Sequence, residues 1–77
     1  MNLTDASITL FKDLWNDAPN WSGTPLVEVS KEERGNLTQL KRAKLLTTTT
    51  SDGEVFAYFT DAGRAFASSL GLGPLGD

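Results

Sequence analysis

The side chains best suited to binding chemistry are concentrated between residues 31 and 44. This segment contains five basic and two acidic residues and carries a net charge of +3, whereas the whole chain of 77 residues carries −3. Lysine and arginine side chains neutralise phosphate groups, and their local field attracts a polyanion even to an acidic protein. The basic residues are Lys31, Arg34, Lys41, Arg42 and Lys44. The segment is therefore either a polyanion-binding surface or simply the solvated face of a helix.

The same segment contains three uncharged polar side chains, those of Asn36, Thr38 and Gln39. A side-chain amide can form two hydrogen bonds with the edge of an adenine, and a hydroxyl can bond to bases or phosphates. These residues alternate with Leu37 and Leu40, whose spacing places apolar groups on one side of a helix. The pattern predicts a helix over about 36–43, with its polar and basic side chains on the outer side.

A β-hairpin is predicted directly after this helix. The pair Asp52-Gly53 separates two β-prone runs, 45–50 and 54–60, and an Asp-Gly pair in such a place favours a type I′ turn with glycine at positive φ. Alternation along the second run divides its side chains between an inward face, with Val55, Ala57 and Phe59, and an outward face, with Phe56 and Tyr58. The outward pair either packs against Trp21 or is presented to a partner.

A helix is expected on each side of this central part. Thr4 is placed to cap a helix from 5 to about 17, and Pro19 is expected to end it. The predicted apolar face of that helix contains Ile8, Phe11, Leu14, Trp15 and Ala18. Thr60 is placed to cap a second helix over 61–70, which Gly71 would end.

The stretch before residue 36 leaves alternatives open. Residues 24–28 suit a short strand or extended segment, although Thr24-Pro25 could also begin a helix. Ser30 and Glu33 match a capping box at the start of a helical turn. Gly35 then either forms the turn between two helices, with Asn36 capping the next one, or lies inside a single helix over 31–43 at a cost of about 1 kcal/mol.

Helix, hairpin and helix in this order resemble the second half of a winged helix-turn-helix domain. The regulators of the MarR and related families carry Leu-x-x-x-Gly-Leu-Leu, a wing turned by Asp-Gly, and Leu-Thr-x-x-Gly-Arg. Here residues 40–46 read Leu-Lys-Arg-Ala-Lys-Leu-Leu, Asp52-Gly53 follows, and residues 59–64 read Phe-Thr-Asp-Ala-Gly-Arg. Gly35-Asn36-Leu37-Thr38 also resembles the opening of a recognition helix. Lys44 stands where the family has the left-handed glycine that ends this helix.

The resemblance covers about half of the chain, and it implies an α+β fold. We expect a small winged helix-turn-helix domain over 1–70, with three helices and a β-hairpin wing, followed by a disordered Gly/Pro-rich tail over 71–77. The implied function is binding of double-stranded DNA by a transcriptional regulator, with the helix around 36–43 in the major groove. The expected DNA-binding residues are Lys31, Arg34, Asn36, Thr38, Gln39, Lys41 and Arg42.

A second function remains open. Some winged helices bind proteins and not DNA, and an acidic chain suits that use. Phe56 and Tyr58 would then be the anchors for a protein partner. The wing tip, 49–54, could follow the DNA backbone, but its Asp52 and Glu54 oppose close contact with phosphate.

The composition narrows the chemistry further. The chain contains no cysteine and no histidine, so disulfides, thiolate or imidazole metal sites and a Ser-His-Asp triad are excluded. We therefore expect a protein that is not an enzyme and has no cofactor or metal. No apolar run approaches the ~20 residues that span a bilayer, and no signal-peptide pattern opens the chain. The expected location is the cytoplasm, and the oligomeric state is left open.

Overall fold

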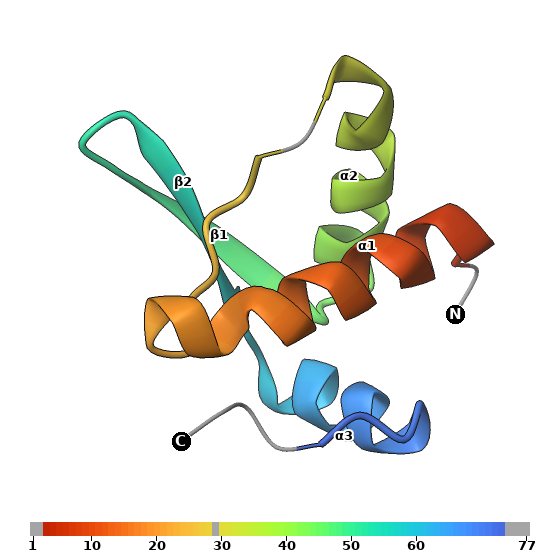
Figure 1. The fold of residues 1–77 in the computed structure, drawn as a ribbon. Coiled ribbons are helices and arrows are strands. Elements are labelled where there is room, and N and C mark those ends of the chain that lie inside the picture. The colour runs from red at the N-terminus through yellow and green to blue at the C-terminus, as the bar shows by residue number, and fades with distance from the viewer. Residues whose placement is uncertain (1–2, 29, 74–77) are drawn as a thin grey trace.

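The computed structural model describes residues 3–28 and 30–73 (Figure 1). Within these residues the chain forms three α-helices and a two-stranded antiparallel sheet, which confirms the expected α+β fold. In chain order the elements are α1 (Asp5–Asp17), the 3-10 turn η1 (Ala18–Trp21), the 3-10 turn η2 (Lys31–Glu33), α2 (Arg34–Arg42), β1 (Leu46–Ser51), β2 (Glu54–Phe59) and α3 (Asp61–Ser69). In Figure 1 the hairpin projects to one side, while α2 and α3 lie above and below α1.

Helix α1 begins and ends where the sequence predicts. The Thr4 hydroxyl accepts a hydrogen bond from the Ser7 backbone N–H (3.2 Å), and the helix ends at Asp17, two residues before Pro19. Its buried face differs from the predicted one in that Ser7 and Leu10 are buried, while Ile8 is only half-buried. The buried face is therefore rotated towards Ser7, whose hydroxyl bonds to α2.

The hairpin has the predicted turn. Asp52 and Gly53 have φ values of 53° and 80°, and positive φ at both central positions is what a type I′ turn requires. Strands β1 and β2 pair from Leu46↔Phe59 to Ser51↔Glu54. Val55, Ala57 and Phe59 pack against the core as predicted, whereas the outward Phe56 contacts Trp21 with ring centroids 6.0 Å apart.

An extended segment pairs with the other edge of β2 through an isolated β-bridge. The Val27 N–H donates to the Val55 carbonyl (2.7 Å), and the Ala57 N–H donates to the Pro25 carbonyl (3.0 Å). Leu26 forms an isolated bridge with Phe56. The extended alternative for 24–28 is therefore the correct one, and β2 lies between this segment and β1.

Residues 31–42 form one helical segment. The turn η2 runs directly into α2, and Gly35 lies inside the helix and not among the residues with positive φ. The prediction of a capping box is wrong, because the Ser30 side chain makes no capping hydrogen bond. Asn36 likewise lies within α2 and does not cap it. The single-helix alternative is thus observed, with its first turn wound as a 3-10 helix.

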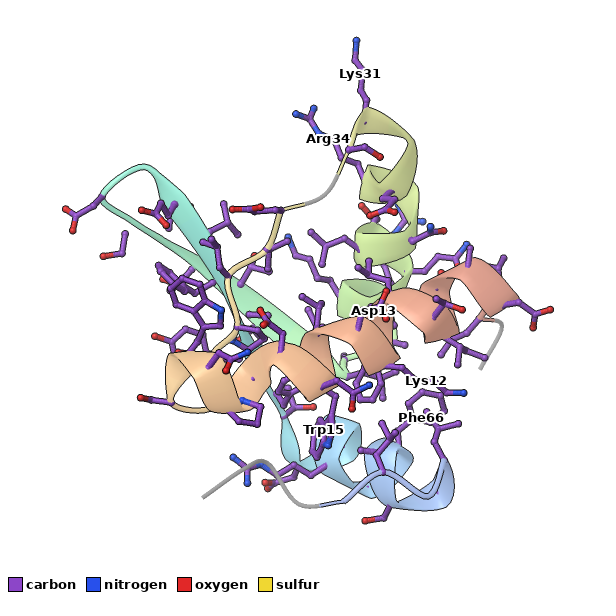
Figure 2. All side chains as sticks on the ribbon, in the orientation of Figure 1. Lys12, Asp13, Trp15, Lys31, Arg34 and Phe66 are labelled. Carbon is purple, nitrogen blue, oxygen red and sulfur yellow. The ribbon has the colours of Figure 1, made fainter. Side chains whose placement is uncertain are left out.

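The core is formed by aromatic rings from three elements. Phe11 of α1 is fully buried and lies 5.4 Å from Phe59 and 5.2 Å from Phe66, measured between ring centroids. Trp15 lies 4.8 Å from Phe59; Figure 2 shows Trp15 and Phe66 between α1 and α3. Around these rings lie the buried Leu10, Leu14, Val27, Leu40, Leu45, Leu46, Ala57 and Ala67 and the half-buried Leu37.

The chain after α3 folds back over the core. Gly71 has φ 77° and ends the helix, Leu72 packs against the core, and the Trp15 indole N–H donates to the Gly73 carbonyl (2.8 Å). Residues 71–73 therefore do not belong to a disordered tail, because the indole and the apolar side chain hold them. The remainder of the predicted tail, 74–77, lies outside the described residues.

Lys44 ends α2 in the conformation that glycine normally adopts. Its φ is 61°; its N–H donates to the Lys41 carbonyl (3.0 Å), and the Leu45 N–H donates to the Leu40 carbonyl (3.1 Å). These two bonds form a Schellman motif, and the accompanying apolar contact is supplied by Leu40 and Leu45, both fully buried. The end of α3 has the same pair of bonds with Gly71 in the left-handed position.

The matched helix ends give a test of backbone strain. Lys44→Gly should raise the free energy of unfolding by about 0.5–1 kcal/mol, because a left-handed residue with a Cβ costs about 1–2 kcal/mol and the added flexibility of the unfolded chain offsets part of that gain. Gly71→Ala, at the equivalent position of α3, should lower it by about 1 kcal/mol. Urea unfolding followed by circular dichroism measures both. A Lys44→Gly variant less stable than the parent would contradict the strained helix end.

Candidate nucleic-acid interface

One face of α2 points away from the core and is basic. Leu40 is fully buried, and residues 34, 38, 41 and 42 lie on the opposite side of a helix with 3.6 residues per turn. Arg34, Thr38, Lys41 and Arg42 are all exposed. Lys31 continues this surface beyond the start of α2, and Figure 2 shows Lys31 and Arg34 extending from the end of α2 farthest from α3. We call these five residues the basic face.

A groove of about 460 Å³ separates α2 from the hairpin. Arg34 and Lys41 border it on the helix, and Thr48 and Thr50 border it on β1. Its remaining lining residues are Val27, Glu28, Leu37, Thr38 and Val55. The groove thus has cationic groups on one wall and hydroxyls on the other, which suits the oxygens of a phosphate backbone, while the Glu28 carboxylate opposes them at one border.

The hydroxyl of Thr38 is already oriented within the helix. It donates to the Arg34 carbonyl at 2.9 Å, so its lone pairs remain available to accept a hydrogen bond from a ligand. Of the three uncharged polar side chains that were predicted to contact bases, that of Thr38 lies on the basic face. A base edge facing it would have to present a donor, such as the amino group of adenine or cytosine.

The two amide side chains that were predicted to contact bases, those of Asn36 and Gln39, face α1. The Gln39 Oε1 accepts hydrogen bonds from the Ser7 hydroxyl (2.7 Å) and the Thr4 N–H (3.2 Å). The Asn36 Oδ1 lies 3.5 Å from the same Ser7 hydroxyl. The predicted outward position of Asn36 and Gln39 is therefore wrong. The physical reason is that fully buried Ser7 requires an acceptor, and nothing in the local pattern of 36–43 indicates this distant partner.

The ends of the hairpin differ in charge. The tip, from Ser51 to Glu54, is exposed and places the carboxylates of Asp52 and Glu54 far from the core. At the base, the exposed Lys44 adds a positive charge beyond the last turn of α2. Attraction for a polyanion is therefore strongest along α2 and the base of the hairpin, and weakest at the wing tip.

Other kinds of site are not found in the described structure. Within residues 3–28 and 30–73, no three His, Cys, Asp or Glu side chains are close enough together to hold a metal ion. No helix in that part of the chain is sufficiently long and apolar to cross a membrane.

Comparisons with known proteins add no assignment. No family model matches the chain, and neither the curated proteins nor the solved structures contain a match.

The contact between Gln39 and Ser7 predicts a structural role for Gln39. Gln39→Ala should lower the free energy of unfolding by about 1 kcal/mol, because the Ser7 hydroxyl loses its shorter hydrogen bond and keeps the Thr4 hydroxyl (3.0 Å) as a partner. Thr38→Ala, one residue away on the exposed face, should change it by less than about 0.5 kcal/mol. Denaturant titrations of the two variants measure the difference.

A second substitution separates this role from a simple loss of volume. Ser7→Ala in the Gln39→Ala background should cost less than Ser7→Ala in the parent, since the hydrogen bond between the two side chains is already lost and only the contact of Ser7 with the Thr4 hydroxyl remains. Fully additive losses, or a Gln39→Ala variant as stable as the parent, would show that the hydrogen bond does not support the contact between α1 and α2.

Proposed function

We propose that the chain is a winged-helix DNA-binding protein, a transcriptional regulator whose α2 enters the major groove of double-stranded DNA. The observation that carries the proposal is the basic face, which lies opposite the core and beside the hairpin groove. Such a surface favours a polyanion through counterion release, even though the whole chain has a net charge of −3. The proposal places the protein in the cytoplasm, bound to DNA.

The side chains of α2 contribute to binding in different ways. Lys31, Arg34, Lys41 and Arg42 neutralise phosphates and position the helix, which gives affinity without sequence choice. Thr38 is the side chain of the basic face best placed to accept a hydrogen bond from a base edge. Asn36 and Gln39 act indirectly, because their amide oxygens are directed towards α1 and hold α2 in its orientation.

The hairpin contributes through the side of β1 that borders the groove. Thr48 and Thr50 face the same groove as Arg34 and Lys41, so a strand of DNA backbone in that groove would meet hydroxyl donors and cations together. The carboxylates at the wing tip repel phosphate. We therefore place the DNA over α2 and the side of β1 that carries Thr48 and Thr50, with the carboxylates of the tip outside the contact.

A second candidate function is that of a protein-interaction module. The observation that favours it is the aromatic side of the hairpin, where Tyr58 is 46% exposed, at the end of β2 away from the acidic tip. Phe56 is a weaker anchor than the sequence predicted, because its ring is half-buried against Trp21. This function requires no contact with DNA, so the two candidates differ in a measurable way.

Charge substitutions test the DNA proposal. Lys41→Ala and Arg42→Ala should each weaken binding to all duplex sequences similarly and reduce the slope of log affinity against log salt by about one unit, because each removes one phosphate contact. Lys12→Ala is the matched control: Lys12 is exposed on α1, outside the basic face, and its loss should leave the salt slope unchanged. Fluorescence anisotropy on mixed-sequence duplexes at several salt concentrations measures both.

Two results decide between the candidates. If the parent protein does not bind duplex DNA even at ~50 mM salt, where the electrostatic contribution is large, the DNA proposal fails and the interaction module replaces it. If Lys12→Ala changes the salt slope as much as Lys41→Ala does, binding follows overall charge and α2 is not the interface.

A further inference from the structure

A second groove lies between α1, the extended segment and η2. It has a volume of about 370 Å³, which is the size of a small binding site. Its lining residues are Leu10, Asp13, Leu14, Asp17, Trp21, Leu26, Glu28 and Glu33. We call it the acidic groove, because four of these residues are carboxylates and none is basic.

The apolar part of the acidic groove is a fixed aromatic platform. Trp21 is 38% exposed, yet its indole N–H donates to the Asp17 carboxylate (2.9 Å) and its ring packs against Phe56. The side chain of Asn20 also donates to Asp17 (3.0 Å). The exposed side of the indole therefore has a defined orientation before anything binds, which lowers the entropic cost of docking.

The three other carboxylates of the groove are exposed. Asp13 lies on α1, Glu28 is the last residue of the extended segment and Glu33 ends η2. These three carboxylates come from separate elements of the fold. An occupant that satisfies them must carry several positive charges at separate points.

A cationic peptide suits both the aromatic platform of Trp21 and the separate carboxylates. Lysine and arginine side chains have apolar stems that can lie on an indole ring, while their charged ends reach nearby carboxylates. Leucine-like side chains between them would fit against Trp21 and Leu26. The charge of the groove excludes an acidic partner and nucleic acid, both of which it repels.

We propose that the acidic groove docks a segment of a partner protein that carries several lysine or arginine residues interspersed with apolar ones. Asp13, Glu28 and Glu33 pair with the cationic groups, and Trp21 receives an apolar side chain or stem. This surface is separate from the basic face and does not depend on the DNA proposal, although Glu28 borders both grooves.

The test uses the peptide Lys-Lys-Leu-Arg-Lys-Leu-Lys and a counterpart in which glutamate replaces every basic residue. The two tryptophan indole N–H signals in a nitrogen-15 NMR spectrum give the readout, since Trp21 lines the groove and Trp15 is bonded to Gly73. The basic peptide should shift the Trp21 signal saturably and leave the Trp15 signal in place. The acidic peptide should shift neither.

Two variants with equal net charge locate the site. Asp13→Asn with Glu28→Gln should weaken binding of the basic peptide about tenfold, since two ion pairs at the rim are lost. Asp5→Asn with Asp61→Asn removes two exposed carboxylates outside the groove and should weaken it by roughly twofold or less at ~0.15 M salt. Dispersed spectra confirm that both variants fold.

Three outcomes overturn the proposal. Equal losses in the two variants would show that the peptide follows net charge and not the groove. A Trp21 signal that moves with protein concentration alone would assign the groove to the basic face of a second copy. Absence of a saturable Trp21 shift with the basic peptide would leave the groove without the proposed partner.

Discussion

The junction between α2 and β1 is the contact on which the rest of the structure depends. The Leu45 N–H closes the end of α2 on the Leu40 carbonyl, and the Leu45 carbonyl accepts from the Thr60 N–H (3.1 Å) at the start of α3. The Thr60 hydroxyl also donates to the Lys44 carbonyl (2.6 Å). Gly63 completes the contact, because a Cβ there would collide with the Leu45 carbonyl oxygen. Leu45 and Thr60 thus fix α2, the hairpin and α3 relative to one another.

A polar contact between α1 and α2 sets the orientation of α2 about its own axis. The fully buried Ser7 hydroxyl bonds to Gln39 and lies near Asn36, while Leu40 enters the core. Because a helix has only 3.6 residues per turn, fixing these side chains inward leaves Arg34, Lys41 and Arg42 outward. The basic face is therefore a consequence of how α2 packs on α1.

Charge segregation lets an acidic chain present two opposite surfaces. The basic residues concentrate along α2, whereas carboxylates of α1, η2 and the extended segment gather around the acidic groove. Glu28 lies at the boundary of the two grooves. At physiological salt the Debye length is about 8 Å, so each surface keeps its own local field and can attract a partner of opposite sign.

The sequence alone determined the features that depend on a few neighbouring residues. Thr4 and Thr60 cap their helices, Asp52-Gly53 turns the hairpin, and Phe11 and Leu40 are buried as predicted, because caps, turns and amphipathic faces are encoded locally. The basic residues of the candidate site were identified in the same way, since long charged side chains on a helix are rarely buried.

The tertiary structure decided the features that involve residues distant in the sequence. Gln39 faces inward because its side chain accepts a hydrogen bond from the Ser7 hydroxyl, and a hydrogen bond from the Trp15 indole holds Gly73 against the core. The acidic groove could not be predicted, because its carboxylates come from three separate elements. The packing of α1 determines which polar side chains of α2 remain free for a ligand. The reason is that a buried hydroxyl must find an acceptor wherever the fold supplies one.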